Sequence, residues 1–200
     1  MCIETSAYQS LRLFIQNRVA VSEEEWDIIR SYFSYHESQA NEHLLEEGKV
    51  CRQLYYLHRG MMRFYVWKDG LDRTKFFAYP DYFFTSQASF HPQRPATENI
   101  QCLENSQYLA LSYEDREWMR ANLAVWNTFA TILKLEVQEA TEKLLMGFQN
   151  ANATERYLFL LEEDPILLER VPLKYLASYI GVTPESLSRI RKNILPHRRT

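Results

Sequence analysis

The sequence holds few of the residues on which disulfide-rich, metal-binding and nucleotide-cradling proteins depend. Its 200 residues include only three cysteines and five glycines. Cys2, Cys51 and Cys102 are odd in number and far apart, so neither a disulfide framework nor a metal-ligand cluster is expected. Five glycines leave no glycine-rich loop that could hold phosphate groups. We therefore expect no disulfide, no metal and no cofactor.

Signals for membrane insertion or export are also missing. No apolar run approaches the roughly 20 residues of a membrane-spanning helix. The first six residues have neither the basic flank nor the apolar stretch of a signal peptide. The sequence therefore predicts a cytoplasmic protein without a membrane partner.

Arrangements that carry enzymatic chemistry are absent as well. No nucleophile stands in a recognisable pattern with a base, and the five histidines are scattered along the chain. An enzyme is the weakest interpretation of this sequence, and we expect none.

What the sequence does contain is an uneven distribution of charge. The whole chain carries a formal net charge of −3. From Val171 to Thr200, six basic residues accompany one acid, a net of +5, so residues 1–170 carry −8. Because DNA phosphates attract cations, a basic end on an acidic body is typical of a DNA-binding segment attached to another domain. A solvated charged tail is the alternative.

The segment from Val171 to Ile194 has the pattern of two short helices joined by a tight turn. Apolar residues recur at helical spacing on each side of Gly181, which can end the first helix in the left-handed conformation. Thr183 can cap the second helix through its hydroxyl, and Pro184 suits the first helical position. This pattern is typical of a helix-turn-helix whose second helix enters the DNA major groove.

Strand patterns dominate the region between about residues 35 and 111. Arg63–Trp67 and Arg73–Ala78 flank Asp69-Gly70, a pair that favours a tight hairpin turn. Asn99–Leu103 and Gln107–Leu111 indicate a second strand pair. Several short strands at regular spacing predict a small antiparallel barrel or roll.

Helical patterns precede and follow that region. Residues 8–18 form one, and Ser22 with Glu25 has the sequence of a capping box before the next. Residues 124–148 predict a helix about 37 Å long. That length exceeds what a small roll needs, so we expect the helix to pair with its copy in a dimer, with packing on its own body as the alternative. The residues expected to line the dimer helix are Phe129, Ile132, Leu133, Ala140 and Leu144.

The predicted fold class is α+β. An antiparallel β-roll over 1–123 precedes a central dimerisation helix over 124–150 and an all-α helix-turn-helix domain over 151–200. Only Leu195–Thr200 follows the second helix of the motif in this sequence, which is short for the β-hairpin wing of a winged helix-turn-helix. We expect little or no wing.

This order of parts resembles the Crp/Fnr family of bacterial transcription regulators. The resemblance rests on Ala153–Tyr157, Pro172–Arg191 and Leu57–Tyr65. It implies a roll like that of cyclic-nucleotide-binding domains, a homodimer, and binding to an inverted repeat in double-stranded DNA. It also implies RNA polymerase as a partner.

The second helix of the motif carries Glu185, Ser188 and Arg189, a Glu-x-x-Ser-Arg pattern similar to that of the Fnr branch. Arg can donate two hydrogen bonds to guanine, and Glu can accept one from cytosine. Four residues apart, both lie on one helix face; an ion pair on that face is the alternative. The residues expected to contact phosphate are Thr183, Ser186, Arg191 and Lys192.

The effector site departs from the family pattern. The family's Gly-Glu pair is replaced by Thr85 and Ser86, and its Arg-Ser pair by Ala96 and Thr97. Without that Arg, the negative charge of a bound cyclic phosphate would lack its cationic partner. We therefore do not expect the protein to bind cyclic AMP or cyclic GMP. Arg94 could serve another anion, with a surface loop arginine as the alternative. The candidate effector-pocket residues are Thr85, Ser86, Arg94 and Thr97, and the effector stays unknown.

The sequence thus predicts a dimeric, sequence-specific transcription regulator with a degenerate cyclic-nucleotide pocket. The alternative is a small-molecule sensor or protein-interaction module that has lost DNA binding.

Overall fold

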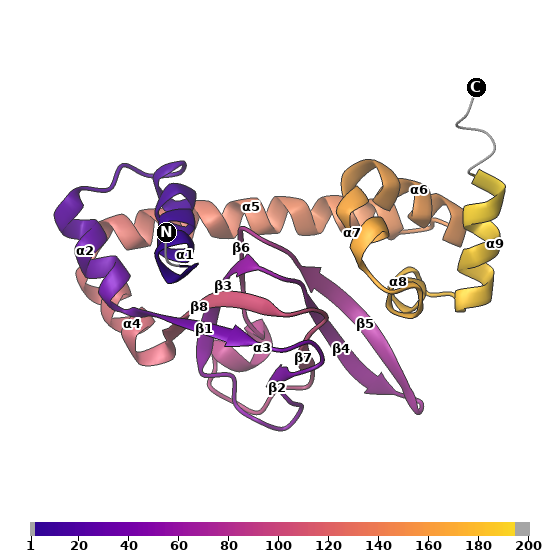
Figure 1. The fold of residues 1–200 in the computed structure, drawn as a ribbon, viewed down its shortest axis with the longest axis horizontal. Helices are drawn as coiled ribbons and strands as arrows, with labels where there is room; N and C mark the ends of the chain where they lie inside the picture. Colours follow the sequence, from indigo (N-terminus) through magenta and orange to yellow (C-terminus); the bar gives the residue numbers. More distant parts are fainter. Residues whose placement is uncertain (1–2, 195–200) are drawn as a thin grey trace. The chain divides into compact units, whose positions relative to one another are not determined.

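The structure, a computed structural model, describes residues 3–194 and divides into two compact units (Figure 1). The first, here the roll unit, comprises Met1–Phe64 and Phe77–Glu136; the second, the helical unit, comprises Tyr65–Phe76 and Val137–Thr200. Helix α5 (Ala124–Phe148) contributes to both. The predicted segments 1–123, 124–150 and 151–200 stay a prediction.

Two antiparallel four-stranded sheets form the roll. One has the strand order β1-β8-β3-β6 and the other β2-β7-β4-β5. The strands are β1 (Phe33–Ser38), β2 (His43–Leu45), β3 (Gln53–Arg59), β4 (Met62–Lys68), β5 (Leu71–Ala78), β6 (Tyr82–Phe84), β7 (Asn99–Cys102) and β8 (Ser106–Ser112).

The hairpin around Asp69-Gly70 is confirmed. It joins β4 to β5, and both turn residues have positive φ, 56° at Asp69 and 74° at Gly70. A two-residue turn of this kind matches the twist of the strands that it connects.

The predicted pairing of Asn99–Leu103 with Gln107–Leu111 is wrong. Both segments are strands, but β7 pairs with β2, whereas β8 lies between β1 and β3. The largely buried β8 has both edges occupied, with Leu111 opposite Phe33 on one side and Leu109 opposite Tyr56 on the other. The short connection after β7 therefore passes from one sheet to the other.

Helices precede the first strand and follow the last strand of the roll. The predicted capping box at Ser22 is present: its hydroxyl accepts from Glu25 N–H, and the Glu25 carboxylate accepts from Ser22 N–H. Ser112 likewise caps its helix by accepting from Asp115 N–H at 3.0 Å. The helices are α1 (Ile3–Gln16), α2 (Glu23–Ser31), α3 (Gln87–Phe90) and α4 (Tyr113–Asn122).

The start of α5 is part of the roll unit's core. Phe129 is 1% exposed, and its ring lies 5.6 Å from that of Phe83 and 6.2 Å from that of Phe14. Leu133 packs against the same core. The expectation that Phe129 lines a dimer surface is therefore corrected, because its side chain is enclosed by its own subunit.

Four helices follow α5 in the helical unit: α6 (Ala153–Glu163), α7 (Pro165–Arg170), α8 (Leu173–Ile180) and α9 (Pro184–Ile194). Asn152, with Glu155, forms a capping box at the start of α6. Gly147 allows α6 to approach α5, because a Cβ there would lie 2.4 Å from the Phe159 ring. Among the described helices, none is long and apolar enough to cross a membrane.

Candidate DNA-binding surface

The turn between α8 and α9 forms as the sequence predicts. Gly181 has φ of 87°, and its N–H donates to the Ala177 carbonyl at 2.9 Å. Val182 N–H donates to the same carbonyl, also at 2.9 Å. Left-handed residues with such bonds are a common way to end a helix, and glycine adopts this conformation without a Cβ penalty.

A neighbouring arginine also satisfies the end of α8. Arg156 on α6 donates from Nη1 to the Ile180 carbonyl at 3.0 Å. A cation at a helix C-terminus is favoured by the helix dipole and fills a hydrogen bond that the helix leaves open. Arg156 thereby links α6 to the C-terminal end of α8, next to the turn that leads into α9.

Helix α9 begins at the predicted cap and is anchored by its apolar face. Thr183 Oγ1 accepts from Ser186 N–H at 3.2 Å and donates to Ser186 Oγ, also at 3.2 Å. Leu187 is fully buried, and Ile190 is half-buried. Burial of these residues fixes which face of α9 is turned toward solvent.

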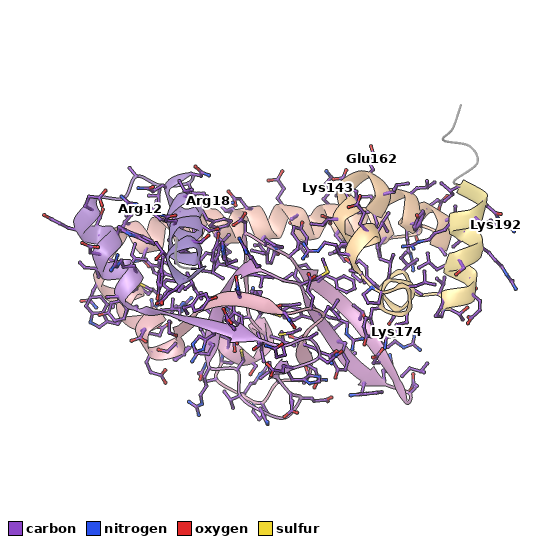
Figure 2. All side chains as sticks on the ribbon, in the orientation of Figure 1. Arg12, Arg18, Lys143, Glu162, Lys174 and Lys192 are labelled. Carbon is purple, nitrogen blue, oxygen red and sulfur yellow. The ribbon has the colours of Figure 1, made fainter. Side chains whose placement is uncertain are left out.

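That outer face carries the three predicted base-reading residues together. Glu185, Ser188 and Arg189 are all exposed, and so is Lys192 one turn farther along. Figure 2 shows Lys192 projecting outward from α9. Residues spaced by three, four and seven positions share one side of a helix. The structure therefore presents a continuous polar surface over at least two helical turns.

The carboxylate of Glu185 is held in its charged form. A backbone hydrogen bond at Glu185 itself lowers its pKa most, and the neighbouring Thr183 side chain and the charge of Arg189 lower it further. Glu185 therefore offers an acceptor at neutral pH, the role that contact with a cytosine amino group requires.

Arg191 points elsewhere than the other predicted phosphate ligands. Its Nη2 donates to the Leu168 carbonyl at 3.2 Å, and its guanidinium lies 5.9 Å from the centre of the Tyr157 ring. Arg191 thus joins α9 to α6 and α7, and its expected contact with phosphate stays a prediction. Thr183 and Ser186 sit together at the start of α9, with Thr183 exposed and Ser186 half-buried.

The predicted effector residues are not brought together in the same way. Thr85 and Ser86 are buried, whereas Arg94 and Thr97 are exposed. The Thr85 hydroxyl donates to the Gln53 carbonyl at 2.8 Å. Arg94 Nε donates to the Ala88 carbonyl at 3.3 Å. These contacts belong to the packing of the loop around α3.

Glu98 belongs to the candidate effector region but was not predicted from the sequence. Its side chain is buried, at 8% exposure, and it accepts a 2.7 Å hydrogen bond from the hydroxyl of fully buried Ser86. A carboxylate thus faces the position where the family pattern has its own Glu. The available signal was an acid at the end of a loop, two residues before the apolar Ile100 of a strand.

Among the side chains of the described residues, no group of three or more His, Cys, Asp or Glu residues could hold a metal ion. Cys51 and Cys102 are buried free thiols. Burial raises the pKa of Cys102 to about 11, an effect that the hydrogen bond from Ser106 only partly offsets.

Comparison with known proteins identifies the roll. Residues 35–122 match the family model of the cyclic nucleotide-binding domain. This range runs from β1 to α4 and contains both sheets. No curated protein matches the chain closely enough to count as a relative.

Solved structures share the fold across both units. FixK2 from Bradyrhizobium japonicum is 18% identical with a TM-score of 0.67, over 82% of this chain and 85% of that one. The Thermus thermophilus Catabolite Activator Protein is 22% identical with a TM-score of 0.53, over 92% and 87%. CLP from Xanthomonas campestris, described as a c-di-GMP responsive global regulator, is 16% identical with a TM-score of 0.63, over 86% and 90%.

These structural neighbours are regulators of the Crp/Fnr type. The predicted succession of an antiparallel roll and a helical region is confirmed at the level of the fold. Residues 35–122 thus resemble a cyclic nucleotide-binding domain, and together with the helical region that follows they share the fold of these solved structures.

Proposed function

We propose that this protein is a sequence-specific DNA-binding transcription regulator that acts as a homodimer. The observation that carries the proposal is the exposed polar face of α9, with Glu185, Ser188 and Arg189 on one side of a helix that follows a tight turn. In a helix-turn-helix, the second helix inserts its N-terminal residues into the major groove.

Each exposed side chain of that face has a role in this proposal. Arg189 donates to guanine O6 and N7, and Glu185 accepts from a cytosine amino group. Lys192, with Thr183, Ser186 and Arg191, contacts phosphates, which fix position but carry no sequence information. The net charge of +5 on Val171–Thr200 supports binding to a polyanion.

The dimer would form along α5, on a different side from the one predicted. Leu145 is 61% exposed and Met146 76% exposed in the second half of the helix, and Leu135 is 61% exposed in the first. Leu135 and Met146 are eleven residues, or about three turns, apart and share one side of α5, with Leu145 at its edge. The half-exposed Ile132 can contribute at its margin, whereas the predicted residues Ala140 and Leu144 lie toward the opposite side of α5.

A charge on this side of α5 tests the dimer. Leu145→Glu should convert the dimer to a monomer in sedimentation equilibrium, because it would place a carboxylate in an apolar interface. Leu13→Glu is the matched control, since Leu13 on α1 is also 61% exposed. If the Leu145→Glu variant stays dimeric, this side of α5 is not the interface.

The roll would regulate DNA binding without a cyclic nucleotide. Ser86 and Glu98 are buried and joined by a hydrogen bond. The buried Glu98 carboxylate would repel a cyclic phosphate. An effector other than a cyclic nucleotide and a contact with RNA polymerase belong to this proposal.

Selection of bound sequences from random duplex DNA tests the function directly. We expect an inverted repeat whose half-sites lie about 34 Å apart. On the selected site, Arg189→Ala should cost about 1–3 kcal/mol and abolish discrimination at one base pair of each half-site. Lys192→Ala is the matched comparison, because loss of a phosphate contact weakens all sequences alike.

The opposite results identify the alternative. If the wild-type protein shows no salt-dependent binding to any duplex, the motif has lost DNA binding and a sensor or interaction module remains. If Arg189→Ala binds with unchanged preference, Arg189 does not read a base.

A further inference from the structure

Strand β5 of the β4–β5 hairpin contacts α8, the first helix of the helix-turn-helix. Residues Tyr65–Phe76 belong to the helical unit, and β5 is the edge strand of its sheet. Thr74 N–H donates to Ser178 Oγ at 3.0 Å, and the Ser178 hydroxyl donates to the Asp72 carbonyl at 3.1 Å. One serine of α8 therefore occupies the open backbone edge of β5.

Docking orients the side chains of β5. Thr74 is buried, whereas its neighbours Arg73 and Lys75 are exposed. Because successive side chains of a strand alternate between faces, Arg73 and Lys75 project from the same face about 7 Å apart. The hairpin thus presents two adjacent cations on a surface that is attached to α8.

Further cations lie close to this pair along the same elements. Lys68 is exposed just before the hairpin turn, and Lys174 is exposed on α8, as Figure 2 shows. Lys174 precedes Ser178 by four residues and so shares its side of the helix. Asp69 and Asp72 are the only acids of Tyr65–Phe76, and Asp72 is half-buried beside its own contact with Ser178.

We propose that the β4–β5 hairpin is a second DNA-contacting element, which binds phosphates through Arg73 and Lys75. This inference rests on the proposed DNA binding by α9. In a helix-turn-helix, the first helix crosses the DNA backbone while the second enters the groove. The first helix here is α8, so a hairpin attached to α8 lies beside the phosphates that this helix crosses. Its partner is the backbone of duplex DNA, whatever the sequence.

Removing the two cations should flatten the salt dependence of binding. Each neutralised phosphate contributes about 0.9 to the slope of log affinity against log salt concentration, so Arg73→Ala with Lys75→Ala should reduce the slope by about 1.8. Between about 50 and 200 mM salt, the wild type should then lose about twelvefold more affinity than the variant. Preference among DNA sequences should not change.

Two controls separate the hairpin from charge alone. Lys49→Ala with Arg52→Ala removes two exposed cations of the roll unit and should leave the slope unchanged. Ser178→Ala keeps every charge but removes the docking hydroxyl, so it should speed hydrogen exchange at the Thr74 amide and reduce the slope. Ser178→Thr, which keeps a hydroxyl, should restore both properties.

The outcomes distinguish this inference from the function on which it rests. If the wild type binds with a steep salt slope that neither Arg73→Ala with Lys75→Ala nor Ser178→Ala alters, the hairpin proposal is overturned and binding by α9 stands. A change in sequence preference in the double variant would also overturn a phosphate role. If the wild type binds no DNA, both proposals fail.

Discussion

The polar face of α9 and the polar interior of the roll contain the same kinds of residue in opposite circumstances. On α9, Glu185, Ser188 and Arg189 are exposed. In the roll, Ser86 is fully buried and donates to the buried Glu98 carboxylate. The first set remains accessible to another molecule, whereas the Ser86–Glu98 contact contributes to the internal structure of the domain.

The ionisable groups of the two regions differ accordingly. Hydrogen bonds at the start of α9 lower the pKa of exposed Glu185, which favours its charged form. Burial raises the pKa of Cys102, which favours its neutral form. Solvation thus keeps a charge available on α9, while desolvation keeps the Cys102 thiol neutral inside the roll.

The largest expected effect contrasts the two sides of α5, the helix that contributes to both units. Phe129→Ala should destabilise the roll by about 3–5 kcal/mol, because it removes a buried ring and leaves a cavity. Leu135→Ala, at an exposed position of the same helix, should change monomer stability by no more than about 0.5 kcal/mol. Urea unfolding followed by tryptophan fluorescence measures both values. Equal losses would contradict the assignment of the two sides.

A smaller effect is expected at the two serines of the compared regions. Ser86→Ala removes the donor to a buried carboxylate and should destabilise the roll by about 1.5–3 kcal/mol. Ser188→Ala, on the exposed face of α9, should leave stability within about 0.5 kcal/mol and change only DNA binding. Thermal unfolding together with DNA titration separates the two. If Ser86→Ala is neutral, the Ser86–Glu98 bond contributes little to the fold.

A structural feature could be predicted from the sequence where local contacts determine it, but not where long-range contacts determine it. The capping box at Ser22, the turn at Asp69-Gly70 and the stop at Gly181 are determined within a few residues, and all three form as predicted. The outward direction of Arg189 also follows from local spacing, because the apolar residues of α9 set which face is buried.

Local sequence patterns could not predict which distant strands pair or which distant side chains are in contact. β7 and β8 are adjacent in the chain, yet each pairs with strands far away. Phe129 belongs to an apolar stripe that fits a dimer or a core equally well, and only its contacts with Phe14 and Phe83 identify the core. The burial of Glu98 beside Ser86 likewise depends on a fold that closes a loop over both residues.

The smallest expected effect at neutral pH is a dependence on alkaline pH that arises inside the roll. Since the pKa of Cys102 is raised to about 11 in the folded protein, the folded state favours the protonated thiol. Its contribution to stability is therefore complete below the thiol's ordinary pKa of 9.0 and is lost as pH rises toward about 11. Cys102→Ala should remove that part of the alkaline loss, measured as the difference in unfolding free energy between wild type and variant across this range.

Alkylation of the same thiol adds a kinetic test of how closed the roll is. Cys102 is fully buried, so at pH 8 iodoacetamide should label it in proportion to the small fraction of molecules in which the roll is open. Ser86→Ala should accelerate labelling by the factor by which it destabilises the roll, whereas Ser188→Ala should leave the rate unchanged. Fast labelling in the wild type would mean that this interior is accessible from solvent, and the contrast with the open surface of α9 would no longer hold.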